Sequence, residues 1–352
     1  MFGLLPSGKN CAMRTPTGRV LVVRLDSDGD VLTAGPAVRA IAAHAEVVLL
    51  CGPGGAQAAR MLPGVDDVVV WECPWVVATP PPVAQDDLDD LVARIRRAGC
   101  GEAVVLTSFH QSPLPTALLL RMAGVQRITG ASVDYPGSLL DVRVRPGVDF
   151  DEGCAEPLRS LAIASAAGYA PSTADDTALR VRGVVPADIA GPYVVVHPGS
   201  LAPSRTCSPG HWASFVAHLA RAGHRVVVTG SPAERALTRE VSAGHALDLG
   251  GRTTYAELAG VLAGAEVVVV GNTGPAHLSA AVGTPVVSLF SPVVPASRWA
   301  PHGVATVVLG DQEERCRDTR SRECPIPGHP CLDGVTPEVV ADAVRLLAGV
   351  AV

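Results

Sequence analysis

The chain has 352 residues, 48% of them apolar, so it is long enough for two domains with separate cores and too apolar for global disorder. Its formal net charge of −6 argues against a surface that binds nucleic acid, because such surfaces are normally basic. The sequence contains no apolar run of the length, about 18 residues or more, that predicts a transmembrane helix.

Residues 1–17 are mixed in polarity and lack the basic end and apolar core of a signal peptide, so we interpret them as a flexible extension. The nine cysteines are odd in number and scattered, a pattern typical of free thiols in a reducing compartment. We therefore expect a cytoplasmic protein whose contact with a membrane is at most peripheral.

Strands and helices alternate along the first half of the chain, which is typical of an open parallel sheet with helices on both faces. The predicted strands are residues 19–25, 46–51, 68–71, 103–107 and 126–130, and the helices are 34–44, 57–61, 86–98 and 115–123. A polar stretch at 134–156, a helix at 157–167 and a second linker at 171–192 interrupt this pattern.

The same alternation returns in the second half. Strands are predicted at 193–197, 225–229, 246–248, 267–270 and 286–290, with helices at 211–222, 234–241, 255–264 and after Pro275. A loop rich in Arg and Cys covers 310–334, and a last helix covers 337–347. The pattern predicts two Rossmann-like α/β domains, residues 18–175 and 190–335, followed by a C-terminal helix in 336–352, with the functional site in the cleft between them.

Three carboxylates follow the first strand, in the sequence Leu25-Asp-Ser-Asp-Gly-Asp30. The turn lacks the G-x-G-x-x-G pattern, so a nicotinamide site is disfavoured. Asp26, Asp28 or Asp30 could serve as a general base at a strand end, or could cap the following helix. Position alone leaves both interpretations open.

Residues 267–290 give the strongest indication of a ligand site. Four valines form a buried strand, Gly271 and Asn272 turn the chain, and Pro275 suits the first turn of a helix. The backbone N–H groups of Thr273 to His277 therefore lie at a helix N-terminus beyond the carboxyl end of a parallel strand, where a phosphate binds readily. His277 could pack there or donate a hydrogen bond to the phosphate.

Two further loops suit a nucleotide. The loop after the strand 193–197 has backbone N–H groups near Gly199 and Ser200 and a cation, Arg205, that could contact a diphosphate; it could equally be structural. Glu234 opens a helix after a strand, where a carboxylate binds ribose hydroxyls or simply favours the helix dipole.

No metal site is predicted. Cys316, Cys324, His329 and Cys331 lie close together in the sequence, but they do not form the C-x-x-C pairs of a zinc site. A loop packed by small thiols is the favoured interpretation.

Taken in order, these segments resemble glycosyltransferase family 9, the heptosyltransferases that use ADP-heptose. The matching pieces are the strand Arg19-Val-Leu-Val-Val-Arg-Leu with Gly29-Asp30, then His197-Pro-Gly-Ser200, Thr229-Gly-Ser-Pro-Ala-Glu234, Leu249-Gly-Gly-Arg-Thr253, Gly271-Asn-Thr-Gly-Pro-Ala-His277, Arg298-Trp-Ala-Pro301 and the tail 324–337. The resemblance extends over residues 18–347.

The resemblance implies a GT-B fold, with the acceptor bound mainly by the first domain and the nucleotide sugar by the second. It implies an inverting transfer that needs no metal and no cofactor beyond the donor, with Asp30 as general base and Asp28 and Gly29 on the acceptor side. The donor-binding residues it implies are His197, Gly199, Ser200, Arg205, Glu234, Asn272, Thr273, Gly274 and His277.

Two positions depart from the family pattern. Asn272 stands where the family usually has Asp, and Arg205 stands for a Lys, so the donor sugar or the acceptor could differ. The expected partners are a nucleotide sugar and an acceptor hydroxyl or amine on a cell-surface glycan or a natural-product scaffold. The alternatives are a sugar-nucleotide epimerase or hydrolase, and a non-catalytic partner protein with the same fold.

Overall fold

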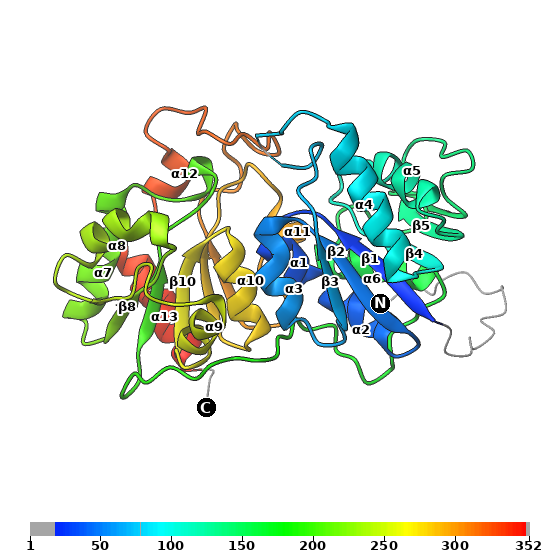
Figure 1. Cartoon of the computed structure of the whole chain (residues 1–352). Helices are drawn as coiled ribbons and strands as arrows, with labels where there is room; N and C mark the ends of the chain where they lie inside the picture. The colour runs from blue at the N-terminus through cyan, green and yellow to red at the C-terminus, as the bar shows by residue number, and fades with distance from the viewer. Residues whose placement is uncertain (1–17, 78, 350–352) are drawn as a thin grey trace.

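The computed structural model describes residues 18–77 and 79–349, which form two fully parallel six-stranded sheets (Figure 1). The first sheet has the order β3-β2-β1-β4-β5-β6, and the second has the order β12-β11-β10-β7-β8-β9. The strands are β1 Arg19–Arg24, β2 Glu46–Cys51, β3 Asp67–Val70, β4 Glu102–Val105, β5 Arg127–Ala131, β6 Val142–Val144, β7 Val194–His197, β8 Val226–Val228, β9 Leu247–Asp248, β10 Val267–Gly271, β11 Val286–Leu289 and β12 Thr306–Leu309. The predicted extension at 1–17 lies outside the described residues.

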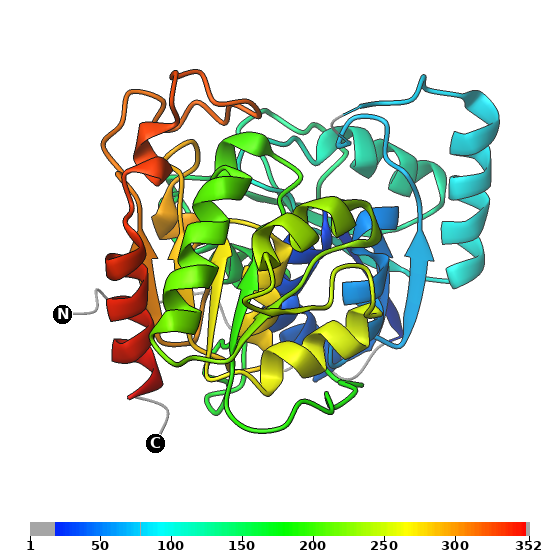
Figure 2. The same ribbon diagram turned by 90° about the vertical axis from the view of Figure 1, so that its left-hand side faces the viewer.

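Helices cover the faces of both sheets; in Figure 2, for example, α7 and α13 lie side by side on the second sheet. The helices are α1 Asp28–Thr33, α2 Gly35–Ala42, α3 Ala56–Met61, α4 Gln85–Ala98, α5 Leu114–Met122, α6 Glu156–Ala166, α7 Pro209–Arg221, α8 Arg235–Ser242, α9 Tyr255–Ala263, α10 Gly274–Ala281, α11 Ala296–Trp299, α12 Pro330–Asp333 and α13 Pro337–Ala348, with short 3₁₀ turns η1 Pro53–Gly55, η2 Pro203–Arg205 and η3 Pro232–Glu234. Within the part of the chain that the structure describes, no helix is long and apolar enough to cross a membrane.

The two parallel sheets and their alternating helices confirm the predicted α/β class. The elements that the sequence did not predict are short: β6, β12, α1, α11 and α12 have three to six residues each. The sequence did not predict helix α1 because its residues, Asp-Gly-Asp-Val-Leu-Thr, begin with the residue types of a turn. A capping box between Ser27 and Asp30 starts this helix, and such a local device does not depend on hydrophobic periodicity.

Each sheet reverses its strand order once, between β1 and β4 in the first and between β7 and β10 in the second. Ligands of open α/β sheets bind outside the carboxyl ends of the strands at such switch points. The segments that follow β1, β4, β7 and β10 carry most of the predicted site residues. The topology therefore places these segments where a ligand is expected.

Helices α1 and α10 join the two halves of the molecule and lie side by side at its centre (Figure 1). Val31 and Leu32 of α1 belong to the same buried apolar cluster as Ala276 and Leu278 of α10. The approach is close at Gly29, where an added Cβ would lie 2.9 Å from Cδ2 of His277 and 3.2 Å from Cα of Gly274. A side chain at this position would push the two helices apart.

We therefore expect Gly29→Ala to lower the midpoint of thermal unfolding by a few °C, since overpacking at a tight contact costs about 1–3 kcal/mol. Gly101→Ala is the matched control, because an added Cβ there meets no atom within 4 Å. Differential scanning calorimetry compares the two variants. Equal midpoints for both would mean that the α1–α10 contact does not constrain the fold.

Candidate functional site

A cavity of about 360 Å³ lies between the two sheets at their switch points. Asp26, Ser27, Gly29 and Asp30 line it from the segment after β1, and Ser108, Phe109 and His110 line it from the segment after β4. Across from them are Arg205, which follows β7, and Asn272, Thr273, Gly274 and His277, which follow β10; Val294, Trp299 and Arg320 complete the lining. The structure thus brings Gly29, Asp30, Arg205 and the four predicted residues 272–274 and 277 together.

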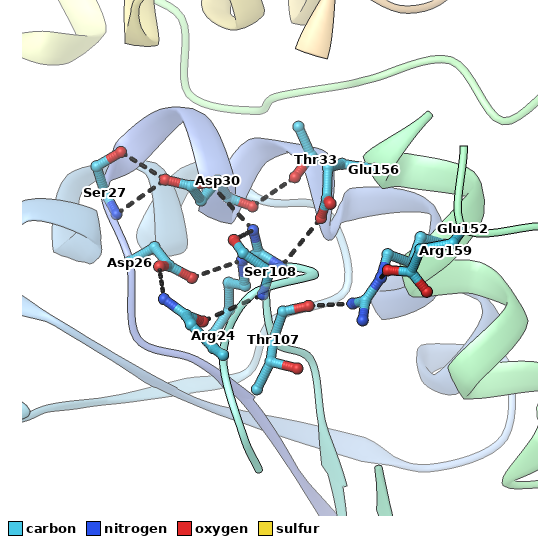
Figure 3. Close-up of polar contacts among 11 residues, drawn as sticks. Arg24, Asp26, Ser27, Asp30, Thr33, Thr107, Ser108, Glu152, Glu156 and Arg159 are labelled. Atoms are coloured by element: carbon cyan, nitrogen blue, oxygen red, sulfur yellow. Dashed lines mark hydrogen bonds and ion pairs between the residues drawn. The ribbon is translucent and has the colours of Figure 1, made fainter. Parts of the chain in front are cut away.

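The first wall is organised by Arg24, the last residue of β1, whose side chain is fully buried (Figure 3). Its guanidinium lies 3.1 Å from a carboxylate oxygen of Asp26, 3.1 Å from Oδ1 of Asp30 and 3.5 Å from Oε2 of Glu156. Burial would lower the pKa of Arg24, but the three carboxylates raise it above its ordinary value. Arg24 is therefore a permanent cation that fixes the position of Asp30.

The carboxylate of Asp30 contacts both the start of α1 and the guanidinium of Arg24. Its Oδ2 accepts hydrogen bonds from the backbone N–H (3.3 Å) and the hydroxyl (2.7 Å) of Ser27, which caps α1, while Oδ1 accepts from Arg24. Burial opposes ionisation of Asp30, but Arg24, Ser27 and His277 together hold its pKa below the ordinary value. An ionised carboxylate that lines a cavity can accept a proton from a bound hydroxyl group.

The pKa of Asp26 shifts in the opposite direction from that of Asp30. Burial raises its pKa to about 6, although Arg24 lies nearby and the amide of Gln111 donates a hydrogen bond to Oδ1. Burial is the main cause, and repulsion by the neighbouring carboxylates of Asp30 and Glu156, which share Arg24, raises the pKa of Asp26 further.

The second wall presents hydrogen-bond donors. Nε of Arg205, Nδ2 of Asn272 and Nε1 of Trp299 are buried and have no hydrogen-bond partner among the described residues, and Nδ1 of His277 is in the same situation. Burial lowers the pKa of His277 to about 4, so its ring is neutral at pH 7. Buried donors without partners are costly unless a ligand satisfies them, and donors beside an arginine suit an anion.

Four predicted donor-binding residues lie off the cavity lining but close to one another, at the ends of β7 and β8. Nδ1 of the buried His197 lies 2.9 Å from Oγ1 of Thr229. Glu234 packs so closely on Gly199 that a Cβ there would overlap its carboxylate. Oε2 of Glu234 also accepts the backbone N–H of Ser231 (2.7 Å), so this carboxylate caps the turn η3, and Ser200 bonds locally to Ala202.

Asp28 also lies off the cavity lining. Its Oδ1 accepts the backbone N–H of Ala58 at 3.3 Å, which ties α1 to α3, and burial raises its pKa to about 6. The contact ties Asp28 to the fold, which distinguishes it from Asp26 and Asp30, the two carboxylates of this turn that line the cavity.

Several residues of the cavity lining were not predicted from the sequence. Phe109 stacks under the guanidinium of Arg298 at 4.1 Å from the ring centroid, and Arg320 approaches the same ring at 5.6 Å. Burial, followed by the charge of Arg320, lowers the pKa of His110 to about 4. Their position directly after β4, at a switch point, was the signal that could have revealed Phe109 and His110. Arg320 comes from a long loop without any such signal.

Two facing Rossmann-like sheets with a cavity between their switch points define the GT-B class of glycosyltransferase fold. The sequence profile of glycosyltransferase family 9 (heptosyltransferase) matches residues 110–329, more than half of the chain. The chain belongs to this family. Asp30 and the rest of the first cavity wall before residue 110 lie outside the matched segment.

Known proteins agree with this assignment. The chain is 31% identical over 208 residues to lipopolysaccharide heptosyltransferase 1 of Pseudomonas aeruginosa, an alignment that covers 57% of this chain and only 58% of that relative. The ADP-heptose LPS heptosyltransferase II of E. coli superposes with a TM-score of 0.72 at 19% identity, covering 94% of this chain and 98% of the other. A family 9 glycosyltransferase from Veillonella parvula superposes with a TM-score of 0.76 at 14% identity, covering 97% and 100%. At these identities the two structures show the shared fold.

The carboxylate cluster around Arg24 predicts a pH-dependent stability. Because the folded-state pKa of Asp26, about 6, lies above the ordinary value of 3.8, this residue destabilises the fold increasingly as pH rises through that interval. We expect Asp26→Asn to raise the unfolding midpoint relative to the wild type by about 2 °C more at pH 7.5 than at pH 4.5. Asp188→Asn, which changes an exposed carboxylate, is the control. A midpoint difference that does not depend on pH would contradict the assignment.

Proposed function

We propose that this protein transfers a sugar, a heptose or a related one, from a nucleotide diphosphate donor to an acceptor in a single inverting displacement. The proposal rests on the two walls of the cavity. One wall carries the ionised carboxylate of Asp30, and the facing wall carries Arg205 and buried hydrogen-bond donors without partners. Such a displacement needs a base for the acceptor and electrostatic stabilisation for the leaving group.

In this reaction the acceptor oxygen attacks the anomeric carbon while its proton passes to Asp30. The bond between the anomeric carbon and the diphosphate oxygen breaks, and the released nucleoside diphosphate carries the electron pair. Arg205 and the N-terminal backbone of α10 at Thr273 and Gly274 stabilise its charge. His277, neutral at pH 7, donates a hydrogen bond to the same group, so the chemistry requires no metal.

We place the diphosphate in the cavity and the nucleoside toward the second cluster, where Glu234 would bind the ribose and Gly199 and Ser200 would border it. His197 lies beside this region, with its Nδ1 2.9 Å from Oγ1 of Thr229. ADP is the favoured nucleotide, because the family is that of heptosyltransferases and the E. coli relative is described as an ADP-heptose enzyme. Asn272, with its unpartnered Nδ2, would contact the donor sugar.

The acceptor is proposed to be a hydroxyl or amine of a glycan or a small natural product, bound against Phe109 and His110. The direct test incubates the protein with ADP-heptose and a panel of such acceptors and measures release of ADP. Release that depends on the acceptor supports the transferase. Release of free sugar without any acceptor would favour a hydrolase or epimerase, and no turnover together with no nucleotide binding would favour a non-catalytic protein.

Asp30→Asn tests the base. The amide keeps the shape of the side chain and can still accept the hydrogen bond that caps α1, but it cannot take a proton. We expect kcat to fall about 10²–10⁴-fold while the Kd for ADP changes less than about twofold. Turnover at the wild-type rate would show that Asp30 is not the base.

Arg205→Gln tests the diphosphate wall. Loss of one charge-assisted contact of about 1.5–3 kcal/mol should weaken ADP binding about 10–100-fold in isothermal titration calorimetry. Arg221→Gln, at the exposed C-terminal end of α7, serves as the control for a change in net charge. If both variants bind ADP equally well, Arg205 does not contact the nucleotide.

A further inference from the structure

Three side chains with different ligand atoms gather outside the cavity, in the second half of the molecule. One ligand atom each of Cys207, His211 and Asp333 lies within 4.8 Å of the other two. Among residues 18–77 and 79–349 this is the one group of three or more His, Cys, Asp or Glu with that spacing. It does not include Cys316, Cys324, His329 or Cys331, the residues that the sequence analysis considered.

The spacing is close to that of a zinc site. Bonds of about 2.0–2.3 Å in a tetrahedral arrangement place neighbouring ligand atoms about 3.3–3.8 Å apart. Contraction of the three atoms by about 1 Å would therefore complete three of the four positions. Thiolate, imidazole and carboxylate are all established ligands of Zn²⁺.

A hydrogen bond of His211 determines which ring nitrogen is available to a metal ion. Its Nε2 lies 2.7 Å from the backbone oxygen of Val335, and because a carbonyl can only accept, Nε2 must carry the hydrogen. Nδ1 is then the nitrogen with the free electron pair. Metal-binding histidines usually donate their other N–H to a carbonyl or carboxylate in this manner. The hydroxyl of Ser208 also accepts the backbone N–H of His211, which fixes the first turn of α7.

Cys207 and Asp333 differ in exposure, so the site would lie between the protein interior and its surface. The thiol is buried, whereas the carboxylate, at the C-terminal end of α12, is exposed. The ligand atoms of Cys207 and Asp333 lie within 4.8 Å of each other, so a thiolate and a carboxylate at this distance would repel each other. A metal ion would offset the repulsion between thiolate and carboxylate.

We propose that Sγ of Cys207, Nδ1 of His211 and the carboxylate of Asp333 bind one Zn²⁺ ion, with water as the fourth ligand. Binding displaces the thiol proton to solvent and involves no change of oxidation state. The ion would fasten the start of α7 to the end of α12. The two regions already meet where the ring of His211 lies on the backbone oxygen of Val335 and where the ring of His329, which precedes α12, lies 3.1 Å from the backbone oxygen of Ser204. Arg205 lies in the fastened segment, so the ion would stiffen the diphosphate wall without touching the reacting atoms.

The test uses the full chain after treatment with a chelator and removal of that chelator. Titration with Co²⁺ should give one equivalent of binding with the absorption of a thiolate–cobalt bond, and Zn²⁺ should abolish that absorption by displacement. Cys207→Ser should lose the thiolate absorption. Asp333→Asn, an exposed change that leaves the core intact, should weaken binding about tenfold or more.

Cys154→Ser and Cys324→Ser are the matched controls, since both thiols are half-buried and lie outside the group. Each should bind Co²⁺ like the wild type. The proposal is overturned if the wild type shows no thiolate–cobalt absorption, if Cys207→Ser and Asp333→Asn both bind normally, or if Cys324→Ser alone removes the signal. Because metal binding is measured directly, the outcome does not depend on the proposed transferase activity.

Discussion

Arg24 is fully buried at the end of β1, and the geometry of the first cavity wall depends on its contacts with Asp26, Asp30 and Glu156. Three carboxylates surround one guanidinium, so this buried cluster carries an excess of negative charge. Burial of unbalanced charge lowers the stability of the fold, so we interpret the cluster as serving the function of the site. The carboxyl groups respond differently to this environment, because the pKa of Asp26 rises while that of Asp30 falls. Of the two carboxylates that line the cavity, Asp30 is the one that its contacts with Arg24 and Ser27 keep ionised.

The second constraint is the contact of α1 with α10. Gly29 allows α1 to approach the start of α10 at Gly274 and His277, and this approach brings the Asp30 wall and the Arg205 wall to the same cavity. The tightness at this point has a functional consequence, because an in-line displacement requires the base and the leaving-group contacts to be held on opposite sides of one carbon atom. The fold and the proposed chemistry therefore rest on the same contact.

The sequence predicted the parallel sheets because valine-rich strands buried on both faces have a clear local signature, as in β10. It also placed Asp30, Arg205 and His277 at strand ends, where the topology then assembles them. Position alone left Asp26, Asp28 and Asp30 unranked, and only the family resemblance singled out Asp30. In the structure their partners, Arg24 and Ala58, distinguish them. The positions of Arg320 in the cavity and of Asp333 beside Cys207 and His211 depend on contacts between segments distant in sequence, which no local pattern encodes.

The central claim is that the cavity binds the diphosphate of a nucleotide. Thermal unfolding in the presence of ADP, UDP, GDP or dTDP, each at about 1 mM, tests it most directly, since a ligand at 100 times its Kd adds about 2.7 kcal/mol of stability. We predict that ADP raises the midpoint by several °C and that the other three raise it less. No shift with any of the four nucleotides would contradict the account.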